Sequence, residues 1–437
     1  MKKSLLALAA LSAIAGAAQA QSSVTVYGIA DAGLVGYNGR ASLGSKGVTT
    51  QSGTGFGDSA QSTSRLGFKG NEDLGGGMSA FFTVEMGLTL DSNQTISSGA
   101  TQNRQSFVGL KKNGVGDFAL GTQYTPIHNA VAATDPGQQN NLMGDMIYTA
   151  NRIAYGANTG GNSSTIAVNP AGVGTTQGGG GGAGDSYTIR ASNALTMNTA
   201  TFGGLTGHAI VILSNANSNQ TTPATGATNG YSGGINNENG WGLGADYAWH
   251  KLFATVAYQS LTAKNPWNSA VGTNVSPGVA GTTNYLAAAG AVTIFGAGQA
   301  NTLGTNVADN QFYAAATYDF GILKAYAQYI NRKATSKIDP TQYVSRSGEQ
   351  IGVRSFVTPT IEAWAQGGLG RYTAFGAGAP TANLTSWQLG SNYWLSKRTN
   401  LYAIYGQQGT SNVSYTVGAA PVSYNANNYA VGVRHTF

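Results

Sequence analysis

The connections between the predicted strands of this chain alternate between very short and long, and this pattern restricts the possible folds most. Successive side chains of a β-strand point to opposite faces, so apolar residues at every second position predict strands. In the segment 78–90, for example, apolar residues such as Val84 alternate with polar ones such as Glu85. Short turns on one side and long loops on the other are typical of a closed antiparallel barrel.

Sixteen segments are predicted as strands, an even number that suits such a barrel. They are 24–38, 62–73, 78–90, 103–112, 117–124, 186–198, 205–214, 240–249, 252–263, 310–320, 322–333, 348–357, 360–372, 385–396, 400–410 and 427–437. The long connections are 39–61, 91–102, 125–185, 215–239, 264–309, 334–347, 373–384 and 411–426. A soluble β-sandwich or an adhesin array shares the short strands and glycine-rich turns. It does not explain the alternating connection lengths or the polar face of the strands.

The composition favours a barrel that crosses a membrane. Charged residues make up 9% of the chain, against about 25% in ordinary soluble proteins. After residue 20 there is no run of about 18 apolar residues, so a membrane-crossing helix is not predicted. Strands cross a bilayer only as closed barrels, because every backbone group in hydrocarbon needs a hydrogen bond. The formal net charge is +6, and the basic residues form no Lys/Arg run, so no nucleic-acid partner is expected.

The first twenty residues have the pattern of a cleaved signal peptide. Lys2 and Lys3 precede an apolar stretch over 5–18, and Ala18-Gln19-Ala20 forms a small-residue cleavage site. We therefore expect residues 1–20 to be removed and residues 21–437 to form one barrel domain.

Several stretches of residues 21–437 resemble the general porins of Gram-negative β-proteobacteria, which are sixteen-stranded, trimeric and located in the outer membrane. They are SSVTVYGIADAGL (22–34), SRLGFKGNEDLGGGMSAFFTVEMG (64–87), RQSFVGLKKNGVGDFALGTQYTP (104–126), YWLSKRTNLYAIYG (393–406) and VGVRHTF (431–437). The resemblance implies an all-β transmembrane antiparallel barrel with short periplasmic turns, long outer loops and a third loop folded into the lumen. It implies passive diffusion of small hydrophilic solutes and ions, with a mild preference for anions.

The resemblance also implies a set of partners. These are two further copies in a homotrimer, outer-membrane lipid and lipopolysaccharide, and the barrel assembly machinery, while no cofactor is implied. In the family the last strand pairs with the first to close the barrel, and its final aromatic residue is similar to the signal that the assembly machinery reads. Phe437 occupies that position here.

Three arginines match the positions that line the narrowest part of the channel in this family. They are Arg65, Arg104 and Arg190 on the predicted wall. Each could instead be an ordinary charge elsewhere on the lumen wall, and Arg152 is a rival to Arg190. Lys69 and Glu85 share the predicted lumen face of Arg65. Where the family commonly has another arginine this chain has Thr122, which weakens any strong anion preference.

The third loop is predicted at 125–185, with 134–146 as its narrowest segment. Its acids Asp135 and Asp145 are expected to face the three arginines. The alternative is that these acids cap a short helix or point to solvent.

No motif for catalysis or metal binding is present. The four histidines are not spaced as metal ligands, and no nucleophile lies in a recognisable catalytic pattern. Two other functions remain open. A substrate-specific channel would require an aromatic row for sugars or a denser basic row for phosphate, and an adhesin or surface antigen would act through its outer loops.

Overall fold

The computed structural model describes residues 23–43, 47–91, 103–148, 186–221, 232–265, 305–337, 343–374, 381–411 and 422–437. The predicted signal peptide, Arg152 and most of the predicted loop 264–309 lie outside the described residues.

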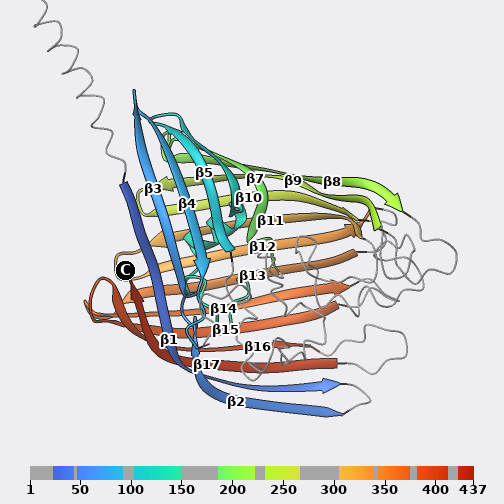
Figure 1. Ribbon diagram of the computed structural model, residues 1–437. Coiled ribbons are helices and arrows are strands. Elements are labelled where there is room, and N and C mark those ends of the chain that lie inside the picture. The colour runs from blue at the N-terminus through green and yellow to red at the C-terminus, as the bar shows by residue number, and fades with distance from the viewer. Residues whose placement is uncertain are drawn as a thin grey trace, which may run out of the picture.

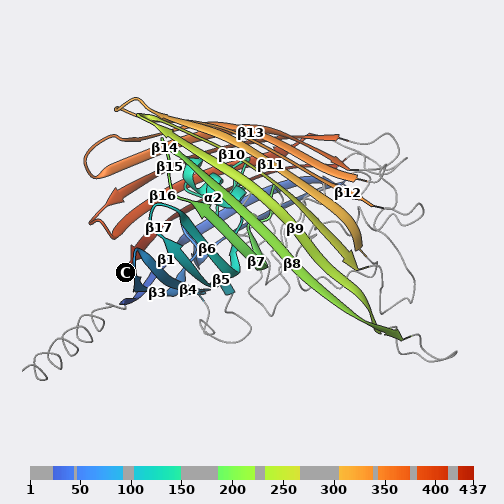
Figure 2. The ribbon, with the colours of Figure 1, turned by 90° about the horizontal axis from the view of Figure 1, so that it is seen from above.

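The described strands form one closed antiparallel barrel (Figures 1 and 2). They are β1 (Ser23–Leu43), β2 (Val48–Asp58), β3 (Arg65–Gly75), β4 (Met78–Gly87), β5 (Asn103–Lys112), β6 (Gly116–Tyr124), β7 (Arg190–Thr199), β8 (Leu205–Thr221), β9 (Ser232–Trp249), β10 (Leu252–Asn265), β11 (Thr305–Asp319), β12 (Lys324–Ser336), β13 (Tyr343–Phe356), β14 (Ile361–Ala374), β15 (Thr381–Trp394), β16 (Thr399–Thr410) and β17 (Val422–Thr436). Consecutive strands pair from β3 to β17, and β17 pairs with β1. The predicted barrel is confirmed.

The strands β2 and β3 occupy one position in the barrel. Both pair with β1: β2 along its second half and β3 along its first. The barrel therefore has the sixteen predicted positions, although the described residues form seventeen strands. The prediction that 39–61 is a long outer loop was wrong. The sequence VTTQSGTGFGD of β2 lacks apolar alternation, so its strand state depends on pairing with β1 and could not be recognised from periodicity.

The break between β2 and β3 is held by a buried carboxylate. Asp31 on β1 accepts hydrogen bonds from the backbone N–H of Gln61 at 2.8 Å and from the Tyr402 hydroxyl at 2.6 Å. The segment 59–64 is thus fastened to the barrel wall from inside rather than continuing the strand ladder.

The two faces of the barrel wall differ in polarity. The outer face presents exposed apolar side chains, among them Val84, Val108, Leu120, Leu213, Leu243, Ile351, Leu369, Leu389 and Val431. The opposite face carries buried polar and charged side chains, including Arg104, Gln259, Asp309, Gln311, Arg332, Gln350, Arg354 and Gln388. Apolar residues outside and polar ones inside are the arrangement expected for a barrel surrounded by lipid and filled with water.

The main apolar core packs around the helix α2 (Pro126–Thr134), which Figure 2 shows surrounded by the strands. Thr125 caps the helix by accepting from the backbone N–H of His128, and Pro126 follows at the first helical position. Ile127 and Val131 on the helix pack with Tyr313 and Ile330 of the wall, and all four are fully or almost fully buried. Among the described residues, no helix is both long and apolar enough to cross a membrane.

The chain closes the barrel with its last residue. Gly28 and Phe437 exchange both backbone hydrogen bonds, at 3.1 and 3.2 Å. A side chain on Gly28 would meet the Phe437 ring at 2.3 Å, so glycine is required beneath this ring. The implied pairing of the last strand with the first is confirmed.

Candidate functional site

Three of the predicted charges meet on the inner wall of the barrel. Arg104 on β5 donates from Nε to Oε1 of Glu85 on β4 at 2.6 Å, and Arg65 on β3 lies 3.9 Å from the same oxygen. Glu85 and Arg104 are both 4% exposed. A carboxylate between two guanidinium groups fixes their positions, because charge-assisted hydrogen bonds are short and directional.

Two tyrosines extend this group of charges along the wall. Tyr27 donates to Oε2 of Glu85 at 3.1 Å, and the Lys69 ammonium lies 5.3 Å from the centre of its ring. Arg104 donates to the Tyr124 hydroxyl at 2.7 Å, and the guanidinium of Arg190 lies 5.4 Å from the centre of the Tyr124 ring.

We call the charged residues of this group the basic wall cluster. Its members are Arg65, Lys69, Arg104, Arg190 and Glu85. Four positive charges and one negative charge give the cluster a formal charge of +3, summed from side chains of β3, β4, β5 and β7. The structure brings the three predicted arginines together with both predicted lumen charges.

The predicted loop acids Asp135 and Asp145 make their contacts elsewhere. Asp135 ends helix α2, and its carboxylate accepts from the backbone N–H groups of Gly137 and Gln139. Asp145 accepts from the N–H groups of Ile147 and Tyr148, each at 2.7 Å. Neither acid forms an ion pair with an arginine of the described chain.

These contacts agree with the alternative that the acids cap local structure, and both side chains are buried rather than solvated. Burial raises the pKa of Asp135 well above its ordinary value, and the nearby charge of Asp145 raises it further. The hydrogen bond between the two buried carboxyls favours the protonated form of Asp135 and the ionised form of Asp145.

Arginines on β13 contact the loop segment in place of the predicted ones. Arg346 donates to the carbonyl oxygen of Met146 at 2.9 Å, and Arg354 donates to that of Pro136 at 2.6 Å. Arg354 also pairs with Glu362 at 2.5 Å. Sequence reasoning did not identify these residues as part of the site. Their common parity on β13 was a usable signal, but the predicted strand began at 348 and left Arg346 in a loop.

A row of glutamines on the inner wall also holds the loop segment. We call it the glutamine row. It consists of Gln259, Gln311, Gln328, Gln350, Gln366 and Gln388, one from each of β10 to β15, all at most 5% exposed.

Three members of the row bond directly to the segment 140–146. The Gln350 side chain accepts from the Met146 N–H at 2.7 Å, Gln366 donates to Asp145 at 3.1 Å, and Gln388 exchanges hydrogen bonds with the Asn140 side chain at 2.5 and 3.0 Å. Because amides donate and accept, the row can satisfy both backbone and side-chain groups of the segment.

Glycines in the wall make room for the same segment. A side chain on Gly406 would lie 1.7 Å from the carbonyl oxygen of Met143, and one on Gly352 would lie 2.5 Å from Pro136. The residues of segment 136–146 therefore sit directly against the backbone of β13 and β16.

The arrangement of the inner wall is suited to passing ions and polar solutes. The interior offers fixed charges and amides, and no group of three or more His, Asp or Glu side chains is placed to hold a metal ion in the described part of the chain. A closed barrel that is apolar outside and charged inside defines the class of outer-membrane barrel channels.

Comparison with known proteins identifies the family. Residues 7–413 match the family model described as Gram-negative porin, and the chain belongs to this family. It is accordingly a protein of the bacterial outer membrane. An outer membrane porin protein of Bordetella pertussis is 37% identical over 156 residues, which cover 33% of this chain and 40% of that protein. The matched region thus spans less than half of this curated relative.

Solved structures share the fold over nearly the whole chain. The anion-selective porin from Comamonas acidovorans aligns with a TM-score of 0.60 and 22% identity, covering 95% of this chain and 100% of that one. A trimer form of OmpT from Vibrio cholerae aligns with a TM-score of 0.52 and 16% identity, covering 95% and 99%. At these identities the likeness is one of fold.

Proposed function

We propose that this protein forms a water-filled channel through the outer membrane for passive diffusion of small hydrophilic solutes and ions. The observation that carries the proposal is the closed barrel with a polar, charged inner face and an apolar outer face. Such a wall lets ions cross without entering hydrocarbon, where a bare charge is very costly. The solute gradient supplies the driving force, and we expect no catalysed reaction.

The segment 125–148 is proposed as the inward-folded loop that narrows the channel. Its support is the set of contacts from helix α2 and residues 136–146 to inner-wall side chains of β10 to β16. In this proposal Asp135 and Asp145 shape the loop, and they do not present negative charge to the opposite wall.

The basic wall cluster is proposed to give the channel a mild preference for anions. Fixed charges act most strongly where the water-filled path is narrow, because ions then pass within a few ångströms of them. The formal charge of +3 favours anions, while Glu85 within the cluster keeps the preference moderate. The name of the Comamonas porin agrees with this direction for a protein of the same fold.

The assembled form is proposed to be a homotrimer, as in the trimer form of OmpT. Phe437 is proposed to act as the recognition signal for outer-membrane assembly, together with lipid and lipopolysaccharide as surroundings of the barrel.

Planar bilayer recordings test the channel and its selectivity together. Refolded protein under a KCl gradient should give stepwise conductance with a zero-current potential that favours chloride. Conductance that favours potassium would keep the channel and refute the role of the arginines. Absence of conductance from folded trimers would contradict the channel and favour an adhesin or antigen acting through its outer loops.

A further inference from the structure

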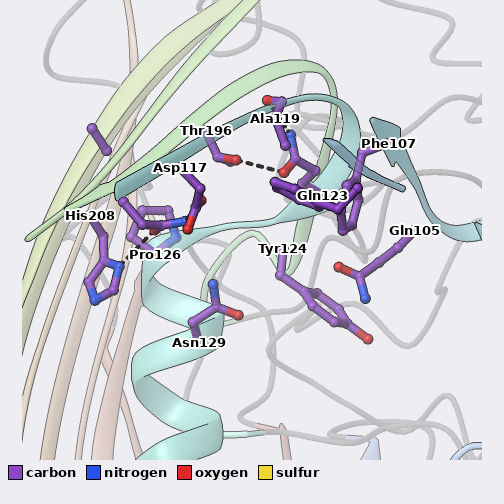
Figure 3. A pocket seen from close by; sticks show the side chains of 13 residues that line it. Gln105, Phe107, Asp117, Ala119, Gln123, Tyr124, Pro126, Asn129, Thr196 and His208 are labelled. Atoms are coloured by element: carbon purple, nitrogen blue, oxygen red, sulfur yellow. Dashed lines mark hydrogen bonds between the residues drawn. The ribbon is translucent and has the colours of Figure 1, made fainter. Parts of the chain in front are cut away.

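A cavity of about 180 Å³ lies on the inner wall, between the strands β4 to β8 and the start of helix α2 (Figure 3). The cavity is near the short-turn end of the barrel, since Asp117 follows the turn at 113–115 and Asn198 precedes the turn at 200–204. The function proposed above makes no use of it. At about 30 Å³ per water molecule, the cavity holds about six waters, a volume comparable with one monosaccharide ring.

One side of the cavity is aromatic. The rings of Phe81 and Phe107 pack edge to face, with centres 6.2 Å apart and planes at 77°. Tyr124 adjoins them and is held in place by the Arg104 hydrogen bond and by the stacked His128 ring, whose centre lies 4.1 Å away. A rigid aromatic wall is suited to the C–H faces of ring-shaped polar solutes.

The other side carries polar groups with free hydrogen-bonding capacity. Gln105 and Asn129 point into the cavity from β5 and α2 (Figure 3), and their side-chain amides form no hydrogen bond with any described residue. Each amide can donate and accept. Asp117 adds a carboxylate that already accepts from Asn198 at 2.7 Å.

A chain of hydrogen bonds fixes the orientation of these polar groups. Asn198 bonds to His208 at 2.8 Å, and His208 bonds to Asp246 at 3.0 Å. Thr255 donates to the other oxygen of Asp246 at 2.6 Å. The Asp117 carboxylate is therefore held by a network from four strands, so little ordering remains to be done when a solute binds.

The fixed charges around the cavity are of both signs and partly offset one another, so neither anions nor cations are strongly favoured there. Asp117 repels anions, whereas Arg104 and Arg190 beside Tyr124 repel cations. Vicinal hydroxyl groups, each both donor and acceptor, match two free amides and one carboxylate.

We propose that this cavity is a binding subsite for the ring of a neutral sugar on its way through the channel. The inference rests on the proposed channel function and names a solute class for it. With a few hydrogen bonds and an open site, we expect affinity on the order of millimolar.

The test is block of the ion current by D-glucose in planar bilayers. The current should fall with glucose concentration along a saturable curve. A polyethylene glycol of equal hydrodynamic size should give only the linear decrease caused by exclusion and viscosity. A linear decrease with glucose as well would overturn the proposal.

Variants locate the site. Gln105→Ala and Asn129→Ala should each raise the half-blocking glucose concentration about fivefold, the effect of losing one ordinary hydrogen bond, and Phe107→Ala should raise it further. Asn38→Ala, which removes an exposed amide beyond the cavity lining, is the matched control and should leave it unchanged. Saturable block that is identical in the wild type and the cavity variants would place the sugar elsewhere and refute this site.

Charged analogues test the proposed neutrality. Glucuronate and glucosamine have the same ring with opposite charge, and both should bind more weakly than glucose. Tighter binding of either would refute the neutral assignment.

Calorimetry of the detergent-solubilised protein with glucose separates this inference from the channel function. Binding without conductance would contradict the channel alone, and conductance without binding or saturable block would contradict the subsite alone.

Discussion

Removal of two arginines from the basic wall cluster should abolish most of the anion preference of the channel. In the variant Arg65→Ser/Arg104→Ser the formal charge of the cluster falls from +3 to +1, since Lys69 and Arg190 remain with Glu85. The barrel should still form, because substitutions on the lumen side change selectivity more than insertion or folding.

The size of the effect follows from Coulomb's law with salt screening. At roughly 7 Å from the path, in water of dielectric constant about 80 and about 0.15 M salt, one arginine changes the energy of a monovalent ion by about 0.25 kcal/mol. Two arginines contribute about 0.5 kcal/mol, which changes the local ion concentration about 2.3-fold. The local concentration of chloride falls by this factor and that of potassium rises by the same factor, so the chloride-to-potassium permeability ratio should fall about fivefold.

The assay is the zero-current potential under a KCl gradient, measured at low and high salt. The fivefold change should shrink at high salt because screening shortens the range of the charges. The matched control is Lys111→Ser/Lys112→Ser, which removes the same charge from exposed positions beside the short turn after β5. An unchanged ratio in the arginine variant, or an equal change in the control, would refute the argument that placement within the wall determines selectivity.

Three further variants test separate parts of the structure. Glu85→Gln raises the cluster charge from +3 to +4 and should increase the chloride-to-potassium ratio about twofold; a decrease would show that Glu85 acts only by positioning Arg104. The raised pKa of Asp135, caused first by burial and then by Asp145, means that the folded protein binds this proton more tightly than the unfolded chain. Its contribution to stability is therefore complete below about pH 4 and is lost as the pH rises through the raised pKa. The thermal midpoint should fall as the pH rises above about 4 in the wild type and vary less in Asp135→Asn, so equal pH dependence of the two proteins would disprove the assignment. Gly406→Ala places a methyl group against the Met143 carbonyl and should push the segment into the lumen, lowering single-channel conductance. Gly367→Ala, where the nearest atom is 3.8 Å away, is its control and should conduct like the wild type.

The strand positions could be predicted because lipid outside and water inside impose a strict alternation on each membrane-crossing strand. The prediction fails where this contrast ends. The outer parts of β8, β9 and β13 extend into polar sequence such as NANSNQT at the end of β8, where both faces carry similar residues. β2 is the extreme case, since its strand state comes from pairing with β1.

The charged site was predicted in part. Arg65, Arg104 and Arg190 could be named together only because the family resemblance supplied a relation between three distant strands. Capping by Asp135 and Asp145 was one of the alternatives that the sequence left open. The sequence could not decide between them, because short-range capping of backbone N–H groups competes with long-range attraction to arginine. Arg346 and Arg354 reach carbonyls about 200 residues away in sequence, and periodicity within a strand carries no information about such partners.

Because the glutamine row is uncharged, a voltage across the membrane should exert little force on the loop segment that the row holds. Moving one elementary charge through 100 mV changes its energy by about 2.3 kcal/mol, but the row holds segment 135–148 with uncharged amides, and Asp135 and Asp145 are the only ionisable acids of that segment. Releasing the segment would break these amide contacts and the hydrogen bonds from Arg346 and Arg354, but it would displace little charge, because both arginines belong to β13. The open channel should therefore behave as an ohmic resistor over a wide voltage range, and closure at high voltage would have to originate in parts of the protein other than this tether.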